Sequence, residues 1–324
     1  MVAIPQHSRR RRWWRSLLAW IDAGAVDAPA QTPAKRIDWL RTLPFVGMHL
    51  ACLAVIWVGW SPVAVITAIA LYLLRMFAIT GFYHRYFSHR SFKTSRAIQF
   101  IFALLGATSV QRGPIWWAAH HRHHHATAEQ ADDPHSPVHH GLWWSHTGWF
   151  LSLEHFSAPD ERVRDWRRYP ELRFLDRFDI VIPTLLAIAL LLTGVLLKAF
   201  APQLGTSGGQ MLVWGFFIST VALYHGTFTI NSLAHRWGKR RYATPDNSRN
   251  NFWLALLTLG EGWHNNHHHY PASARQGFFW WEVDITYYLL RAMSALGLIW
   301  DLKPVPAELT ESNRIAPLTK RFYK

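Results

Sequence analysis

Four long apolar stretches constrain the fold of this 324-residue chain more than any other feature. They cover residues 43–60, 62–82, 180–200 and 211–233. Each is close to the roughly 20 residues that an α-helix needs to cross the hydrocarbon core of a bilayer. Short links join the first stretch to the second and the third to the fourth, which favours two helical hairpins. The sequence therefore predicts an all-α integral membrane protein with four transmembrane helices arranged as two hairpins.

The distribution of positive charge predicts how these helices are oriented. Neither hairpin link contains Lys or Arg, whereas residues 1–42, 83–179 and 234–324 are rich in both. The positive-inside rule then places both termini and both long polar regions in the cytosol, as a helical cap on the hairpins 43–82 and 180–233. Arg75 lies inside the second apolar stretch and is expected to face protein or water rather than lipid. Residues 97–110 and 278–300 are predicted to form helices at the membrane surface.

The formal net charge of +14 limits the classes of molecule that the chain is expected to bind. Arg9 to Arg12 and Arg15 surround Trp13 and Trp14 near the start of the sequence. Basic residues beside tryptophans, ahead of an apolar stretch, favour a bilayer surface with anionic headgroups. No nucleic-acid recognition motif accompanies the charge, so nucleic acid is not an expected partner. The lone Cys52 excludes disulfides within the chain and any site built from several cysteines.

Histidines gather in four places within the predicted cytosolic regions. These are residues 84–89 (HRYFSH), 120–125 (HHRHHH), 231–235 (NSLAH) and 260–269 (GEGWHNNHHH). Residues at positions i, i+3 and i+4 share one face of an α-helix, and two triples have that spacing: His121, His124 and His125, and His264, His267 and His268. His123 and His269 fall outside these faces. His84 and His89 would diverge by about 140° on a straight α-helix, so they converge only on ions between them or at the helix end.

So many well-placed imidazoles exceed the coordination capacity of one ion and predict a histidine-rich di-metal site. Imidazole binds zinc, copper, nickel and iron, so the spacing does not select the element. The alternatives are histidines that only cap helices, a metal-sequestering tract, and a metal transporter or sensor. Transporters place their ligands near the bilayer midplane. Here only His49 and His225 fall within apolar stretches, which favours a built site on the cap.

From the second apolar stretch to Asp301, the chain resembles the membrane-bound fatty acid desaturases of the stearoyl-CoA (delta-9) type. Residues 84–89, with Arg90, Ser91 and Lys93 after them, resemble the first histidine box of that family. His121-Arg-x-His124-His125 resembles the second box, and Asp133-Pro134-His135 follows at the spacing of the family. Residues 260–268 resemble the third box, and residues 231–238 resemble the segment that supplies one more histidine and an asparagine.

The resemblance implies an oxygen-dependent acyl-CoA desaturase that introduces a cis double bond, at the delta-9 position, into a saturated fatty acyl-CoA. It also implies O2 as co-substrate and two iron ions held by nine histidines, with Asn231 reaching one iron through water. Trp117 and Trp149 match family aromatics and are candidate contacts for the acyl chain. The expected iron ligands are His84, His89, His121, His124, His125, His235, His264, His267 and His268.

Two departures from the family bear on the partners. Ala119 and His120 stand where the animal acyl-CoA enzymes carry the Arg-Asp pair that helps to bind coenzyme A. An acyl-lipid desaturase or a related fatty acyl hydroxylase is therefore the alternative, although the cytosolic arginines keep acyl-CoA as the first expectation. The haem motif of a fused cytochrome b5 domain is missing from the sequence. Electrons are therefore expected from a separate donor such as ferredoxin, cytochrome b5 or a reductase.

Overall fold

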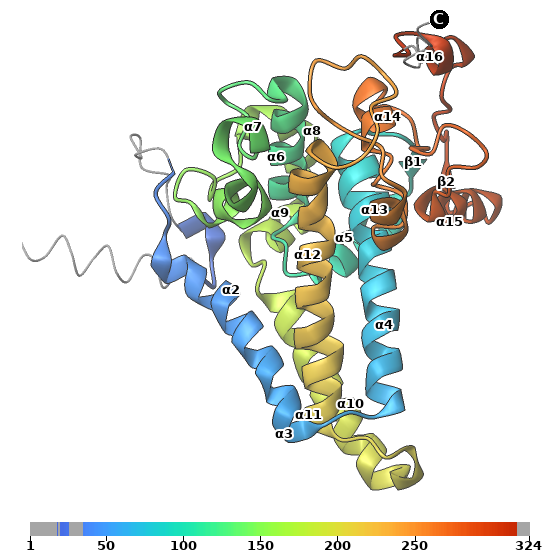
Figure 1. Ribbon diagram of the computed structural model, residues 1–324. Helices are drawn as coiled ribbons and strands as arrows, with labels where there is room; N and C mark the ends of the chain where they lie inside the picture. The colour runs from blue at the N-terminus through green and yellow to red at the C-terminus, as the bar shows by residue number, and fades with distance from the viewer. Residues whose placement is uncertain (1–17, 19, 26–34, 316–324) are drawn as a thin grey trace, which may run out of the picture.

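The computed structural model describes Leu18, residues 20–25 and residues 35–315. Most of the predicted basic segment 1–42 lies outside the described residues. The described chain is mostly helical, and it forms a narrow stem below a broader cap (Figure 1). Its only strands within the described residues are β1 (Lys93–Thr94) and β2 (Ile299–Trp300), which pair antiparallel with Lys93 opposite Trp300.

The stem contains three helical runs that are long and apolar enough to cross a membrane. The first is α4 (Pro62–Phe77) with the π-helix η3 (Ala78–Ser88), and the second is α10 (Val181–Phe200). The third joins α11 (Gly208–Leu212), η8 (Val213–Ile218), α12 (Ser219–Ser232) and η9 (Leu233–His235).

The first predicted span is a shorter apolar helix, Thr42–Val58. It consists of α2 (Trp39–Ala51), the 3-10 turn η2 (Cys52–Ala54) and α3 (Val55–Val58). Three of the four predicted spans therefore have the required length and composition. The arrangement with four spans stays a prediction.

The two hairpin links meet at the end of the stem that lies away from the cap. Ser61 caps α4, because its hydroxyl accepts a hydrogen bond from the Ala64 N–H, and Pro62 supplies the fixed backbone angle of a first helical turn. The same hydroxyl donates to Thr206 Oγ1, at 2.9 Å, in the other link. Gln210 Nε2 also donates to the carbonyl of Val58. These polar contacts tie the two predicted hairpins together at their turns.

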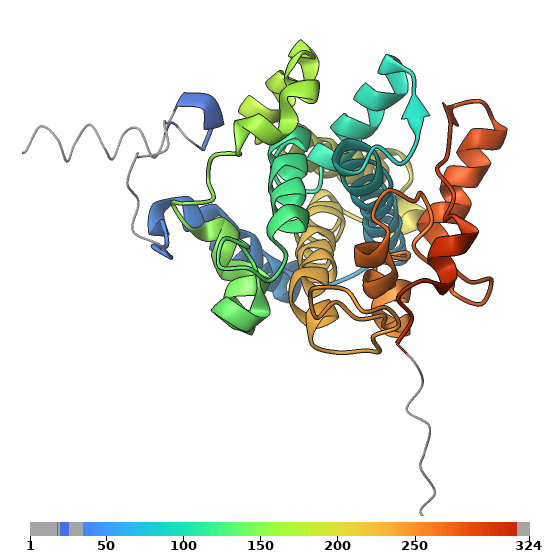
Figure 2. The same cartoon turned by 90° about the horizontal axis from the view of Figure 1, so that it is seen from above.

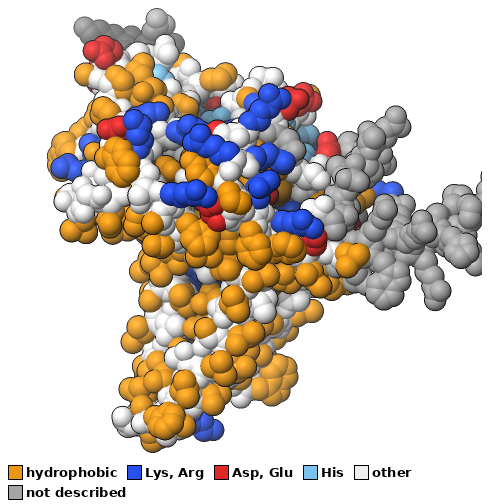
Figure 3. Space-filling view, turned by 180° about the vertical axis from the view of Figure 1, so that it is seen from behind, with side chains coloured by type: hydrophobic (Ala, Val, Ile, Leu, Met, Phe, Trp, Pro, Cys, Tyr) orange, Lys and Arg blue, Asp and Glu red, His pale blue; other side chains and the backbone are white. Residues whose placement is uncertain are grey.

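The cap surrounds the upper ends of α4 and α12 (Figures 1 and 2). Hydrophobic side chains cover the visible face of the stem, whereas Lys and Arg side chains gather over the cap (Figure 3). The remaining elements are η1 (Ala23–Ala25), α5 (Arg96–Ala107), α6 (Pro114–Thr127), α7 (Pro137–His140), η4 (Trp144–Gly148), η5 (Trp149–Leu151), η6 (Asp160–Val163), α8 (Arg164–Arg167), α9 (Pro170–Arg177), η7 (Pro202–Leu204), α13 (Phe252–Leu257), α14 (His264–His269), α15 (Ile285–Ala295) and α16 (Ala307–Glu311).

The start of α6 is fixed by a carboxylate from α9. Asp176 Oδ1 accepts a hydrogen bond of 2.8 Å from the Trp116 N–H in the first turn of α6, where a negative group stabilises the helix dipole. A Cβ on Gly113 would lie only 2.4 Å from the Asp176 Cα, so the close approach requires glycine. This contact positions the helix that carries the second histidine box.

The predicted surface helix 278–300 is shorter than expected. The helix α15 begins only at Ile285, where the Asp284 side chain caps it by accepting from the Tyr287 N–H. Glu282 and Asp284 are fully buried rather than displayed on a polar face. Trp280 and Trp281 are exposed, in keeping with contact to a membrane surface.

The buried Arg75 confirms the expectation that its side chain faces protein. Its guanidinium is 0% exposed and donates to Ser219 Oγ and Thr220 Oγ1 of the neighbouring α12 run and to the Thr108 carbonyl. A further bond goes back to the Leu71 carbonyl of its own helix. The arginine therefore joins two stem helices and the end of α5 through hydrogen bonds buried within the protein.

We expect Arg75→Ala to lower the free energy of unfolding by about 3 kcal/mol, because it leaves several buried oxygen acceptors without a donor. The thermal unfolding midpoint of the purified protein in detergent measures the change. Lys93→Ala is the control, because this side chain is 70% exposed and its ion pair with Asp301 is worth at most about 1 kcal/mol. Equal unfolding midpoints for the two variants would contradict the role of Arg75.

Candidate metal centre

The π-helix η3 brings the two histidines of the first motif together. Its hydrogen bonds run from residue i+5 to residue i, and the His89 N–H donates to the His84 carbonyl over 3.2 Å. A wider turn rotates each residue by less than the 100° of an α-helix, so residues five apart return to nearly the same face. The ring centroids of His84 and His89 are 4.9 Å apart. The segment is therefore not the straight α-helix on which these two rings would diverge, and they meet at its end.

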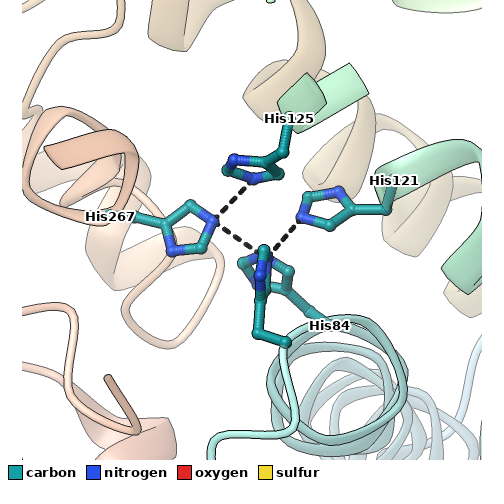
Figure 4. Close-up of side chains that lie close together, drawn as sticks. His84, His121, His125 and His267 are labelled. Carbon is teal, nitrogen blue, oxygen red and sulfur yellow. Dashed lines mark hydrogen bonds between the residues drawn. The ribbon is translucent and has the colours of Figure 1, made fainter. Parts of the chain in front are cut away.

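Five imidazoles converge at one point above the stem, and we call them the five-histidine cluster. Their closest nitrogens lie within 4.8 Å of one another. His267 Nε2 is 3.1 Å from His84 Nε2 and 2.9 Å from His125 Nε2 (Figure 4). His89 Nε2 is 2.8 Å from His121 Nε2. The rings come from η3, α6 and α14, and they belong to His84, His89, His121, His125 and His267.

A second group, the four-histidine cluster, has the same character. Its nitrogens also lie within 4.8 Å of one another, and they belong to His124, His235, His264 and His268. His264 Nε2 and His235 Nε2 are 3.1 Å apart. The rings of His125 and His268, one from each cluster, stack with centroids 4.5 Å apart. The two clusters are therefore neighbours, and together they contain all nine of the predicted histidine ligands.

Carboxylates hold the outer nitrogens of several of these rings. In the four-histidine cluster, the Nδ1 atoms of His124, His235 and His268 lie 2.9, 3.2 and 2.7 Å from carboxylate oxygens of Asp133, Glu129 and Asp246. In the five-histidine cluster, Glu261 contacts His84 Nδ1. A carboxylate on one ring nitrogen orients the ring, fixes its tautomer and leaves the other nitrogen as the electron-pair donor to a metal.

Arg85 joins the first and third histidine motifs beneath the clusters. Its guanidinium donates to Glu261 Oε1 at 3.0 Å and to Asp284 Oδ1 at 2.9 Å, and the side chain is 1% exposed. Glu261 also accepts from Gln276, whose amide nitrogen lies 3.3 Å from His84 Nδ1. Because one carboxylate contacts both Arg85 and His84, the direction of the His84 ring is set by a network of buried charges.

Burial sets the protonation state of the clusters. Desolvation, followed by repulsion between neighbouring rings, lowers the pKa of five buried histidines well below the ordinary value: His89, His121, His125, His264 and His267. These rings are neutral near pH 7, and the neutral imidazole is the form that binds metals. Burial alone would raise the pKa of Asp133 and Asp246, but His124 and His268 hold it far below the ordinary value, so both carboxylates are ionised.

The residues present fit bound metal ions. His124 Nε2 and His268 Nε2 are buried, point into the four-histidine cluster and have no hydrogen-bond partner among the described residues. Buried polar atoms are rarely left unpaired, because the loss of water costs about 1–3 kcal/mol for each. Imidazole nitrogens without a protein partner suit divalent iron, zinc or copper. Asp133 and His135 form a third possible group with His124.

An apolar cavity of about 470 Å³ reaches the five-histidine cluster through His121. Both predicted substrate contacts line it. Trp117 stacks on His121 with centroids 5.0 Å apart, and Trp149 stacks on Trp116 at 5.7 Å. Asn231, the predicted partner through water, also lines the cavity. The cavity continues between α2, α10 and α12 along apolar side chains such as Phe45, Met48, Pro183, Ala187, Ile188 and Phe216.

Four other histidines that the sequence singled out, His49, His123, His225 and His269, belong to neither cluster. His123 Nε2 contacts the Asp132 carbonyl and His269 Nε2 contacts the Leu309 carbonyl, as expected from their positions outside the helical faces. His49 and His225 meet each other with Nε2 atoms 3.1 Å apart. His225 uses its other nitrogen to contact His146, so these three rings form a chain rather than converging on one point.

Comparison with known proteins agrees with this geometry. The sequence model of the family "Fatty acid desaturase" matches residues 59–300, about three quarters of the chain. The chain belongs to the fatty acid desaturase family. It is 37% identical over 278 residues to the sn-1 stearoyl-lipid 9-desaturase of Anabaena variabilis, covering 85% of this chain and 97% of that relative. It is 35% identical over 297 residues to the acyl-CoA C20 Delta5-desaturase of Anemone leveillei, covering 87% and 90%.

Sequence reasoning missed the groups that orient the histidines of the two clusters. Glu129, Asp246 and Glu261 lie far in the sequence from some of their partners, and only the folded chain reveals the pairing. Asp133 was noticed by its spacing alone, without its contact to His124. One general rule could have prompted a search for these carboxylates: a metal-binding imidazole usually has a carboxylate or carbonyl on its outer nitrogen.

We expect Asp246→Asn to weaken metal binding about 10- to 100-fold, because the amide no longer holds the His268 ring as an anion does. The measurement is the iron retained by purified protein during titration with a chelator. Asp132→Asn is the matched control, because Asp132 is an exposed carboxylate next to Asp133. Unchanged iron retention in Asp246→Asn would show that this contact does not support a metal site.

Proposed function

We propose that this chain is an oxygen-dependent di-iron desaturase that introduces a cis double bond at the delta-9 position of a saturated acyl chain. The observation that carries the proposal is the apolar cavity that ends against His121 of the five-histidine cluster. A methylene chain offers nothing to hydrogen-bond, so an apolar cavity is the site that holds it. The proposed iron ligands are the nine histidines of the two clusters, with Asn231 as a partner through water.

The reaction removes one hydrogen from each of two neighbouring methylenes and consumes O2, two electrons and two protons, with release of two waters. O2 is the oxidant, and bound iron would activate it for a reaction that side chains alone cannot perform. The residues of the chain bind and orient the substrate and exclude water. Trp116, Trp117 and Trp149 form the apolar wall nearest the clusters, and the carboxylates keep the imidazole nitrogens directed inward.

We propose a lipid-linked acyl chain as the substrate, in place of the acyl-CoA expected from the sequence. The cavity runs between α2, α10 and α12, which are apolar helices of the stem. Arg112 is the only Lys or Arg among the described residues that line it, and its guanidinium is paired with Asp179 at 3.0 Å. The phosphates of coenzyme A would need free cations. The relatives include the sn-2 palmitoyl-lipid 9-desaturase of Nostoc, 35% identical over 284 residues, covering 85% of this chain and 93% of that relative.

The proposal extends to topology and electron supply. The four apolar helices would cross the bilayer as two hairpins, with both termini and the clusters on the cytosolic side. The arginines of the cap would then face the headgroups and cytosol, in keeping with Figure 3. Electrons would come from a separate donor such as ferredoxin, cytochrome b5 or a reductase.

We expect His124→Ala and His267→Ala each to abolish the unsaturated product while the protein still inserts into membranes, because each removes a ligand from one cluster. The measurement is the fatty acid profile of a host that lacks its own desaturase, with double bonds located by mass spectrometry. Purified wild-type protein should retain about two irons per chain, as paired-metal chemistry requires.

His123→Ala and His269→Ala are the controls, since both rings contact backbone carbonyls outside the clusters. Full activity in His124→Ala or His267→Ala would overturn the ligand assignment. An alcohol in place of a double bond would identify a hydroxylase, and exchangeable zinc without any oxidised product would favour a transporter.

A further inference from the structure

His120 is a buried histidine that neither cluster uses. It precedes His121 on α6, and consecutive residues of an α-helix point about 100° apart. His121 therefore faces the five-histidine cluster, while His120 lines another part of the same cavity. The His120 side chain is 4% exposed, and its ring lies 4.4 Å from the Trp116 ring and 5.6 Å from the Trp149 ring.

Two side chains at this point of the cavity have buried ring nitrogens without a well-formed hydrogen bond among the described residues. Neither ring nitrogen of His120 has a well-formed hydrogen bond among the described residues, although the backbone of Ser157 lies beside the ring. The indole Nε1 of Trp149 is also buried without a hydrogen-bond partner. Two such groups, on rings whose centroids are 5.6 Å apart, are costly to bury, which indicates that a polar ligand atom completes the site.

The chemistry of the two side chains defines that ligand atom. The indole N–H only donates, and a neutral imidazole provides one N–H donor. An acceptor with two lone pairs satisfies both, and a carbonyl oxygen is the smallest such group. The nearby Arg112 does not take this role, because it is paired with Asp179 and stacks on the Phe156 ring at 4.2 Å.

We propose that His120 and Trp149 hold the carbonyl oxygen of the acyl linkage, the ester of a lipid or the thioester of coenzyme A. This inference rests on the proposed desaturase function. A saturated acyl chain has one polar group, at the linkage, and otherwise identical methylenes. Once that carbonyl is fixed in the cavity, the length of chain from it to His121 decides which pair of carbons meets the clusters. His120 and Trp149 would then be positioning residues that set the location of the double bond.

A binding experiment tests the carbonyl site without relying on catalysis. The probes are methyl stearate and methyl octadecyl ether, which differ mainly in the carbonyl. Their affinities for the purified iron-loaded protein are measured by displacement of a fluorescent fatty acid. We expect the wild type to bind the ester about tenfold more tightly than the ether, because one neutral hydrogen bond is worth about this factor.

The variants assign that difference to His120. His120→Phe keeps an aromatic ring between Trp116 and Trp149 but removes both nitrogens, and it should bind the two probes equally. His120→Gln restores a donor and should recover part of the preference for the ester. His123→Phe is the control on the same helix, because His123 contacts the Asp132 carbonyl, and it should keep the full preference. Iron content should stay unchanged in all three variants.

A wild type that binds both probes equally would overturn the proposal, as would an unchanged preference in His120→Phe. Loss of iron in both His120→Phe and His120→Gln would also overturn it, since the residue would then support the clusters.

In the expression host, His120→Phe should spread the double bond over neighbouring positions. Comparison of stearoyl glycerolipid with stearoyl-CoA as substrates identifies the linkage that is used. A preference for the ester probe in a protein that forms no double bond would refute the desaturase function alone.

Discussion

The clusters depend on one buried guanidinium. Arg85 has no access to water, and the carboxylates of Glu261 and Asp284 neutralise its charge from the segments that precede α14 and α15. Removing one partner of such a group leaves an uncompensated charge in a medium that solvates it poorly. Glu261 also contacts His84, so the interaction that joins η3 to the third histidine motif also orients a ring of the five-histidine cluster. The same buried ion pairs therefore stabilise the cap and orient the His84 ring.

The two clusters differ in their surroundings, although both consist of imidazoles. Three carboxylates contact rings of the four-histidine cluster, whereas one contacts the five-histidine cluster. The apolar cavity touches the latter through His121. Anionic partners make an imidazole a stronger electron-pair donor. Two ions held in the two clusters would therefore experience different electric fields. The ion in the five-histidine cluster, which has fewer anionic neighbours, would lie beside the substrate.

Local composition predicted the helical class and the apolar stem. Spacing within one helix singled out six of the nine histidines, and the resemblance to the family implied the other three, His84, His89 and His235. The spacing of His121, His124 and His125 reports a shared face directly, and the structure places these rings in the two clusters. Spacing could not predict the π-helix that brings the rings of His84 and His89 together, since the choice between α and π turns depends on packing. The burial of Glu282 and Asp284 was missed for a similar reason, because their partners Asn266 and Arg85 come from other segments.

The π-helix η3 makes the first histidine motif sensitive to length rather than to composition. Over Ala78–Ser88 the backbone advances with more residues per turn than the α-helix α4 that leads into it. Many side chains there could be exchanged without altering which residues face the cluster. Loss of a single residue ahead of His84 that returned the segment to the α-helical period would turn His89 about 140° away from His84. The number of residues in this segment is therefore more constrained than their identity. Related chains are expected to differ within it by substitution and not by insertion or deletion.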